Sequence, residues 1–247
     1  MTRRVPSVAE VRAAYRPKFA HELRTEWAIA LVYRPVSFML TPLFAACGAS
    51  PGMVTLLGLA IALSLPWLAL DLGTGAWAWV GVLGLVFCVL DCVDGDLARA
   101  TGRASPWGAY SDFVSDTLYR IALYASIGLM VDAAAGHAGE SARVLGVAGE
   151  RAGLAAGLLC ALLAIAARAC RLFIEAGARG VHERLAPAQS GAGNVTVAFL
   201  SGIDHLLPVG VLAFGAAGRL EWLLAYLLAY SLGDLLLTQY VAWNRLR

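Results

Sequence analysis

The sequence has few charged residues for its length. Charged side chains make up 15% of the 247 residues, whereas hydrophobic side chains make up 60%. A soluble domain of this size needs more polar surface, so the composition excludes an ordinary soluble protein and predicts a membrane protein. The net charge of +2 gives no sign of nucleic-acid binding, and we expect no nucleic-acid partner.

Three further patterns are missing. The N-terminal segment has no compact hydrophobic run followed by a small-residue cleavage site, so we expect no cleavable signal peptide. The five cysteines match neither a zinc-binding spacing nor a disulfide framework, which leaves them as reduced packing residues. No internal repeat or low-complexity segment is visible.

Long apolar runs dominate what is present. Met53 to Leu70 carries no charge, and Ala76 to Leu90 is a second run that ends at Asp91. About 20 apolar residues span a bilayer as a helix. The sequence therefore predicts an all-α integral membrane protein with six transmembrane helices. Their expected limits are 51–71, 75–99, 107–133, 147–176, 191–216 and 219–243.

The segment before these spans has a different pattern. Ser7 and Glu10 form a capping box, and apolar residues then recur at helical spacing opposite basic ones. The apolar residues are Val8, Val11, Tyr15 and Phe19. This indicates an amphipathic helix on the membrane surface or, alternatively, a helix packed on the cytoplasmic face. Pro35 is expected to open a second juxtamembrane helix. Residues 1–50 thus form an N-terminal cytoplasmic and juxtamembrane region, and 51–247 a transmembrane domain.

The basic residues indicate the orientation. Fifteen of the nineteen Lys and Arg residues fall on the side of the two termini in a six-span topology. Because basic residues concentrate on the cytoplasmic side, we expect both termini and the active site in the cytoplasm, with the protein in the inner cell membrane.

Four aspartates lie where the second predicted span ends and the third begins. Asp91 and Asp94 are three residues apart, and Asp112 and Asp116 are four apart, so each pair projects from one helical face. A short connection would bring the two helices back antiparallel. The four carboxylates are then expected to converge at the cytoplasmic edge of the bilayer.

Such a cluster needs a cation. Two like charges about 5.5 Å apart repel by roughly 3 kcal/mol at an effective dielectric near 20. Aspartate oxygens suit Mg²⁺ or Mn²⁺, and Mg²⁺ usually completes its shell with water and substrate phosphate. This points to a diphosphate substrate. Gly95 and Gly108 would allow close approach of a base or ribose, Ala98 keeps the region narrow, and Arg99 could engage the diphosphate.

The spacing of these residues resembles the signature of the CDP-alcohol phosphotransferases, also called CDP-alcohol phosphatidyltransferases. All eight positions agree with it: Asp91, Asp94, Gly95, Ala98, Arg99, Gly108, Asp112 and Asp116. The resemblance extends to the six spans, the preceding juxtamembrane helix and the entry from Pro51 to Thr55. One departure is Gly52, where relatives commonly have asparagine, which removes any side-chain hydrogen bond from that position.

The resemblance implies a homodimer whose cytoplasm-facing cavity binds the CDP moiety beside two metal ions. It implies metal binding by Asp91, Asp94 and Asp112. It also places Asp116 at the metal site and makes it the base that deprotonates the acceptor hydroxyl. The residues implied to line the nucleotide site are Gly95, Ala98, Arg99 and Gly108.

Three arginines outside the signature are candidates for binding the acceptor. Arg168 and Arg171 share a helix face and either bind an acceptor phosphate or serve as membrane anchors, Arg171 then pairing with Glu175. Arg120 lies too deep to reach water, so it should pair with Asp204 or, failing that, Asp234. That pair is either structural or part of the acceptor pocket.

The leading function is a metal-dependent transfer of a phosphoalcohol group in phospholipid biosynthesis. The expected donor is CDP-diacylglycerol, the acceptor is a small hydroxylated compound, and CMP is released. An alternative in the same family uses a soluble CDP-alcohol such as CDP-ethanolamine or a CDP-polyol, with a lipid or sugar-phosphate acceptor. A third hypothesis is a cation-coupled transporter, since acids within a membrane often mark ion paths. The clustering of the aspartates at one membrane edge disfavours it.

Overall fold

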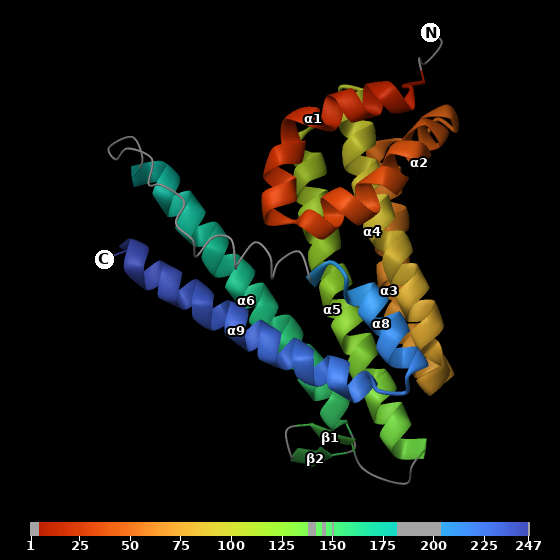
Figure 1. Cartoon of the computed structure of the whole chain (residues 1–247), viewed down its shortest axis with the longest axis vertical. Coiled ribbons are helices and arrows are strands. Elements are labelled where there is room, and N and C mark those ends of the chain that lie inside the picture. The colour runs from red at the N-terminus through yellow and green to blue at the C-terminus, as the bar shows by residue number, and fades with distance from the viewer. Residues whose placement is uncertain (1–4, 138–141, 145–146, 150, 182–203, 247) are drawn as a thin grey trace.

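The computed structural model describes residues 5–137, 142–144, 147–149, 151–181 and 204–246, and these residues are almost entirely helical (Figure 1). The α-helices are α1 (Val8–Thr25), α2 (Arg34–Ala46), α3 (Pro51–Leu72), α4 (Trp77–Ala100), α5 (Pro106–His137), α6 (Ala152–Val181), α8 (Leu207–Ala216) and α9 (Leu220–Leu246). A π-helical turn, η1 (Ile29–Tyr33), precedes α2, and a 3₁₀ turn, η2 (Gly73–Ala76), joins α3 to α4. A small antiparallel hairpin, β1 (Ala142–Val144) and β2 (Val147–Gly149), lies between α5 and α6.

The first helix begins as its sequence predicts. Ser7 Oγ accepts a hydrogen bond from Glu10 N at 3.3 Å, and Glu10 Oε2 accepts one from Ser7 N at 2.8 Å, which completes the capping box. Val11 and Tyr15 are buried against the rest of the protein, whereas Phe19 remains exposed. Because α1 contacts both α2 and α4, it is packed onto one end of the bundle instead of lying free.

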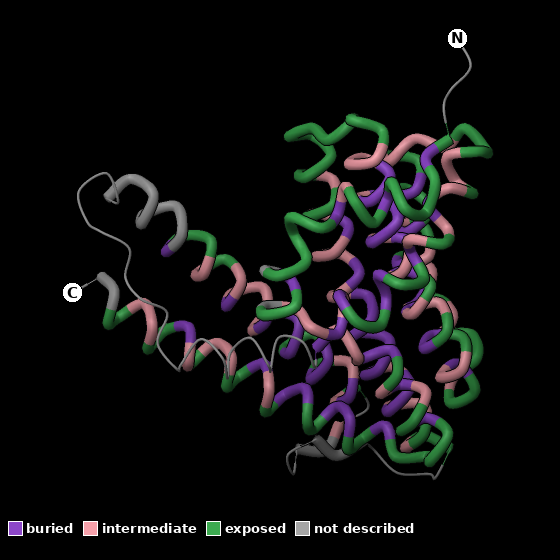
Figure 2. The backbone as a smooth tube through the Cα atoms, turned by 45° about the horizontal axis from the view of Figure 1, so that its top comes forward, coloured by how far each residue is buried: buried purple, intermediate pink, exposed green. Residues whose placement is uncertain are grey.

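The main hydrophobic core is formed by α3, α4, α5 and α8 together with the first halves of α6 and α9. Helices α6 and α9 pack side by side, and their second halves extend away from the bundle (Figure 1). Figure 2 shows that the buried residues concentrate in this bundle and along the inner stripe of α6 and α9. The largest fully buried side chains include Leu65, Leu123, Tyr124, Ile127, Met130, Leu224 and Leu227. Apolar residues face outward as well, as expected for helices surrounded by lipid.

Glycines bring α5 and α6 into close contact. A Cβ atom on Gly128 or on Gly157 would collide with backbone of the opposite helix. Small residues at a helix crossing allow this approach in membrane proteins. Asp132 on α5 also accepts hydrogen bonds from Gly153 N at 2.7 Å and Leu154 N at 2.8 Å, at the start of α6. These contacts fix α6 against α5 and thereby set which residues of the two helices meet further along.

Five segments are long and apolar enough to cross a membrane, by length and composition: Ile29–Ala46, Pro51–Ala100, Pro106–His137, Ala152–Ile174 and Leu220–Asn244. The 50-residue segment contains both α3 and α4. The structure therefore confirms an all-α, multi-pass integral membrane protein.

The expected count of six spans is not established. Helices α3, α4, α5, α6 and α9 coincide with five of the six predicted spans. The remaining one, 191–216, lies partly outside the described residues, and its described part contains α8, an apolar helix of 10 residues. Conversely, Ile29–Ala46 was expected to be juxtamembrane but satisfies the length and hydropathy of a span.

Candidate active site

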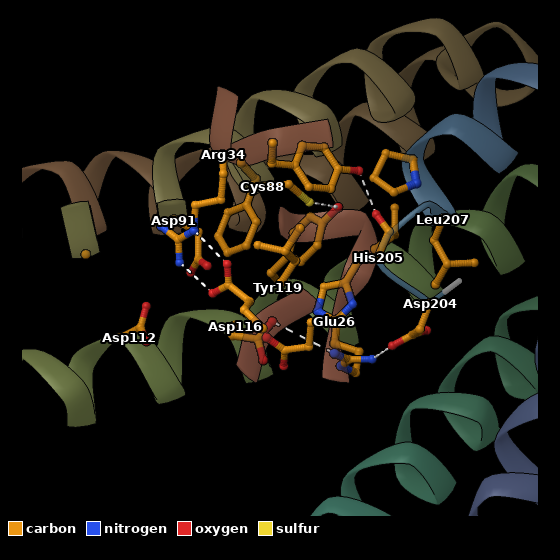
Figure 3. A pocket seen from close by; sticks show the side chains of 18 of the residues that line it. Glu26, Arg34, Cys88, Asp91, Asp112, Asp116, Tyr119, Asp204, His205 and Leu207 are labelled. Carbon is orange, nitrogen blue, oxygen red and sulfur yellow. Dashed lines mark hydrogen bonds and ion pairs between the residues drawn. The ribbon is translucent and has the colours of Figure 1, made fainter. Parts of the chain in front are cut away.

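A cavity of about 240 Å³ lies between α1, α4, α5 and α6, and we call it the aspartate cavity. Asp91 enters it from α4, and Asp112 and Asp116 from α5 (Figure 3). Phe87 and Tyr119 stack with ring centroids 3.9 Å apart and form an aromatic wall. The structure thus places three of the four predicted metal ligands around one space.

The fourth aspartate is turned elsewhere. Asp94 is buried and does not line the aspartate cavity; its Oδ2 accepts a hydrogen bond from Thr55 Oγ1 on α3 at 2.5 Å. Asp91 thus lines the cavity and Asp94 bonds to α3, and metal binding by Asp94 stays a prediction. Residues three apart on a helix differ in direction by about 60°, which is enough to send one toward the cavity and the other toward a neighbouring helix.

Arginines compensate the charge of Asp116. Arg168 on α6 donates a hydrogen bond to Asp116 Oδ2, and Arg120, one turn further along α5, lies 3.9 Å from Oδ1. The guanidinium of Arg168 also lies over the ring of Phe113, 4.3 Å from its centroid. Asp112 lines the same cavity and is more exposed than Asp116.

The predicted nucleotide residues divide into two groups. Gly95 and Arg99 line the aspartate cavity, and a Cβ on Gly95 would lie only 3.1 Å from Arg99 Nη2, so this glycine makes room for the guanidinium. Arg99 Nε is buried and has no hydrogen-bond partner among the described residues. Ala98 and Gly108 are not in contact with the cavity, and Gly108 is exposed at the start of α5, where its N–H donates to Ser105 Oγ at 3.1 Å.

A second cavity, of about 210 Å³, adjoins the first and shares Asp116, Arg120 and Arg168 with it. We call it the arginine cavity because Arg171 completes a set of three arginines there. Its other polar lining residues include Asp204, His205, Tyr230 and Asp234.

Each arginine in this cavity has an acidic partner. Arg120 forms an ion pair with Asp204, which confirms the predicted pairing, and Asp204 Oδ1 also accepts a hydrogen bond from Tyr124 at 3.0 Å. Arg171 pairs with Asp234 at 2.7 Å; the side chain of Glu175, its expected partner in the anchor interpretation, lies outside the described part of the structure. Four carboxylates line the arginine cavity, since Glu26 joins Asp116, Asp204 and Asp234, and its three guanidinium groups lie where a bound anion could reach them.

The N-terminal segment contributes residues that the sequence reasoning missed. Lys18 and Glu22 of α1 line the aspartate cavity, and Tyr33 donates a hydrogen bond to the carbonyl oxygen of His205 at 2.6 Å. Arg34 is 5% exposed and lies within an apolar segment. A lone charge in such a segment is a recognisable sign of a buried partner, although the sequence does not say which one.

Glu22 has an unusual environment for a carboxylate. It is 2% exposed, and burial alone would raise its pKa. The hydrogen bonds and positive charge of Arg34 outweigh burial and hold the pKa of Glu22 below its usual value. Burial, together with the neighbouring Glu22, raises the pKa of Tyr15. Glu22 therefore stays ionised and Tyr15 neutral at physiological pH.

The donor chemistry of the aspartate cavity fits a hard divalent cation, since Asp91, Asp112 and Asp116 all supply carboxylate oxygens. Among the described residues, however, no three His, Cys, Asp or Glu side chains are gathered tightly enough to hold one metal ion. Asp94 bonded to Thr55 and Asp116 paired with Arg168 account for this arrangement. The ligand types agree with the sequence prediction, and Asp91 lies close enough to the other three carboxylates for their charges to interact. Metal binding by the four aspartates stays a prediction.

Comparison with known proteins gives the family. The family profile for CDP-alcohol phosphatidyltransferase matches residues 49–227, and the chain belongs to this family. Its members transfer a phosphoalcohol group from a CDP-alcohol to a hydroxyl acceptor and are generally dependent on a divalent metal. A search of curated proteins found no match to the chain. Most of α3 to α9 falls inside the matched region, whereas α1 and α2 precede it.

Proposed function

We propose that this protein is a metal-dependent enzyme of phospholipid biosynthesis that transfers a phosphatidyl group from CDP-diacylglycerol to a small hydroxylated acceptor and releases CMP. The observation that carries the proposal is the junction of two cavities. Three of the four signature aspartates, Asp91, Asp112 and Asp116, line one of them, and three arginines line the other. A lipid donor suits a site built between membrane-embedded helices.

The aspartate cavity is the proposed donor site. Two Mg²⁺ or Mn²⁺ ions would be held there by Asp91, Asp94, Asp112 and Asp116. Asp94 is included because of the family resemblance and not because of its present orientation. The bound metal would neutralise the diphosphate and stabilise CMP as the leaving group. Gly95 and Arg99 border the nucleotide in this proposal, and the buried Nε of Arg99 is a donor for it. Ala98 and Gly108 are assigned to the nucleotide site on resemblance alone.

The chemical step needs a base beside the acceptor. The acceptor hydroxyl oxygen forms a bond to the phosphorus that carries the alcohol, and the bond from that phosphorus to the bridging oxygen of CMP breaks. Asp116 takes the hydroxyl proton. Arg168 and Arg120 hold the Asp116 carboxylate between the two cavities, so it can face the acceptor and the donor together.

The arginine cavity is the proposed acceptor site. Arg120, Arg168 and Arg171 line it, and planar guanidinium groups bind phosphate or carboxylate oxygens well. Their present partners are Asp204, Asp116 and Asp234. The acceptor in this proposal therefore carries a hydroxyl group and an anionic group.

Three wider features of the proposal rest on the sequence. The distribution of basic residues supports a cytoplasmic active site with both termini on that side of the inner membrane. The division into a juxtamembrane region, 1–50, and a six-helix domain, 51–247, follows the same topology. The homodimer rests on the family resemblance.

The experiment measures CMP release by the purified full-length protein. CDP-diacylglycerol and CDP-ethanolamine are each supplied with Mg²⁺ and a panel of acceptors that includes glycerol phosphate, inositol phosphate and serine. We expect CMP from CDP-diacylglycerol when a suitable acceptor is present, and a loss of about 10²-fold or more in Asp116→Asn. Asp71→Asn, at the exposed end of α3, is the matched control and should retain full activity.

The other outcomes discriminate between the alternatives. Release from CDP-ethanolamine alone would replace the lipid donor with a soluble CDP-alcohol. No release from either donor, combined with cation uptake by vesicles that contain the protein, would support the transporter and reject the enzyme.

A further inference from the structure

A chain of buried charged residues connects the N-terminal helices to the helix that carries the aspartates and Arg99. Glu22 on α1, Arg34 on α2 and Asp96 on α4 are 2%, 5% and 1% exposed. Glu22 and Arg34 precede the region that matches the family, 49–227, so the family assigns them no role. Charged residues are buried to this degree only when they are closely paired, so each of these contacts constrains the structure.

The first link joins α1 to α2. Arg34 Nε donates to Glu22 Oε2 at 2.9 Å, and Arg34 Nη2 donates to Glu22 Oε1 at 2.8 Å. This two-point contact fixes both the position and the plane of the guanidinium. Tyr15 donates to Glu22 as well, and its ring centroid lies 4.7 Å from Arg34 Cζ. The end of α1 and the start of α2 are thereby held in a single orientation.

The second link joins α2 to α4. Arg34 Nη1 donates to the carbonyl oxygen of Cys92 at 3.0 Å and to Asp96 Oδ1 at 3.1 Å. Ser37 Oγ donates to the other oxygen, Asp96 Oδ2, at 2.5 Å. One arginine of α2 therefore contacts both α1 and α4, and both oxygens of Asp96 are occupied.

The last link reaches the aspartate cavity. Arg99 Nη2 donates to Asp96 Oδ1 at 2.8 Å, so this one oxygen receives both Arg34 and Arg99. Two carboxylates, Glu22 and Asp96, thus pair with two guanidinium groups, and Lys18 Nζ lies 3.7 Å from Glu22 Oε1. Loss of either carboxylate would leave positive charge without its partner.

The contact with Asp96 leaves one part of Arg99 available. One Nη atom is fixed, while Nε is buried and has no hydrogen-bond partner among the described residues. Gly95 leaves space beside the guanidinium, whose Cζ lies 5.9 Å from the Tyr15 ring centroid. A free arginine side chain would sample many rotamers and lose that freedom on binding a ligand. Asp96 removes that freedom in advance.

We propose that Glu22, Arg34 and Asp96 are positioning residues that hold Arg99 in the orientation that binds the diphosphate of the donor nucleotide. The proposal rests on the assignment of the aspartate cavity as the nucleotide site. It gives the N-terminal helices a function in substrate binding besides membrane attachment. None of the three residues needs to touch the nucleotide, because each acts through Arg99.

The test is a double-mutant cycle on CDP binding. The dissociation constant for CDP is measured by calorimetry, with Mg²⁺ present, on the full-length protein and on Asp96→Asn, Arg99→Met and the double variant. Asp96→Asn keeps the shape of the side chain but removes the charge that orients Arg99. We expect it to weaken CDP binding about tenfold, as the loss of a charge-assisted contact does. In the Arg99→Met background the same change should alter the affinity by less than about twofold.

A purely structural role predicts a different result. Asp96→Asn would then weaken CDP binding by the same factor in both backgrounds, and that outcome would overturn the proposal. Unchanged CDP affinity in Asp96→Asn would overturn it too. Ser7→Ala, which breaks the α1 capping box without touching this chain of charges, is the matched control and should bind CDP like the wild type.

Two further outcomes keep the test decisive. If Asp96→Asn does not fold, as judged by its elution and thermal unfolding, Glu22→Gln takes its place in the cycle. We then expect Glu22→Gln to weaken CDP binding in the wild-type background and to have little effect in the Arg99→Met background. Wild-type protein that binds no CDP would reject the proposed function itself, and the positioning role with it. If the wild type binds CDP but the effects of the two substitutions on CDP affinity simply add, the positioning role alone is rejected.

Discussion

Arg168 on α6 donates a hydrogen bond to Asp116 on α5 at the boundary between the aspartate cavity and the arginine cavity. This pair connects the proposed base to the proposed acceptor site. It forms because glycines and the Asp132 cap hold α6 tightly against α5 at their other ends.

Replacing Arg168 tests the role of this pair. Arg168→Met should lower kcat by about 10²-fold, because Asp116 loses the partner that orients it, and should raise KM for an anionic acceptor. Arg168→Lys keeps the charge but not the planar donor geometry, so it should recover only part of the loss. The control is Arg151→Met, at the exposed start of α6. Activity of Arg168→Met within about twofold of the wild type, measured by CMP release, would contradict a catalytic contribution of this pair.

The ion pair between Arg120 and Asp204 should contribute to stability. Arg120→Met leaves the buried Asp204 with Tyr124 as its remaining described partner, and we expect a loss of about 3 kcal/mol in the free energy of unfolding. Adding Asp204→Asn should recover part of that loss, because the uncompensated charge disappears. Denaturant unfolding of the three variants measures this. If folded Arg120→Met has the acceptor KM of the wild type, Arg120 is structural and not part of the acceptor pocket.

Glu22 should make the stability depend on pH in acid. Arg34 lowers the pKa of Glu22 in the folded protein despite burial, so the ionised carboxylate stabilises the fold. This contribution is fully present above the ordinary glutamate pKa of about 4.3 and is lost as the pH falls through the lower folded value. Glu22→Gln should therefore be less stable than the wild type at pH 7, and the difference should shrink below about pH 4. Unfolding curves of both proteins across this pH range measure the difference in their free energies of unfolding. A difference that does not change with pH would contradict the coupling of Glu22 to Arg34.

Gly95 should be needed for the position of Arg99. A Cβ at this site would lie 3.1 Å from Arg99 Nη2 and 3.3 Å from Nη1, so the guanidinium would have to move. We expect Gly95→Ala to weaken CDP binding about tenfold, which is about 1.4 kcal/mol. Gly75→Ala is the matched control, because a Cβ there would meet nothing within 4 Å. Equal affinities for the two variants would show that the space beside Arg99 is not used.

Some features could be read from the sequence because they follow from local rules. The capping box needs only Ser7 and Glu10 at the right spacing, and the structure has it. The pairing of Arg120 with Asp204 followed from depth along two helices, because a charge inside a membrane needs a partner at its own level. The family followed from eight residues at fixed spacing, and its profile matches the chain.

Other features depended on packing that no local pattern contains. The turn of Asp94 toward Thr55 depends on how closely α3 lies against α4, which spacing along one helix does not determine. Arg34 was not singled out because its partners, Glu22 and Asp96, are 12 and 62 residues away and on other helices. The extent of the segment Ile29–Ala46 was underestimated because Arg34 and the prolines interrupt its apolar pattern.

Metal-dependent nucleotide binding tests the central claim most directly. CDP is titrated calorimetrically into the wild type, Asp91→Asn and Asp112→Asn, with Mg²⁺ and again after EDTA. We expect saturable CDP binding by the wild type with Mg²⁺, loss of that binding in EDTA with recovery when Mg²⁺ is restored, and weaker CDP binding in both variants. CDP binding that is the same with and without metal, or unaffected by either aspartate, would contradict it.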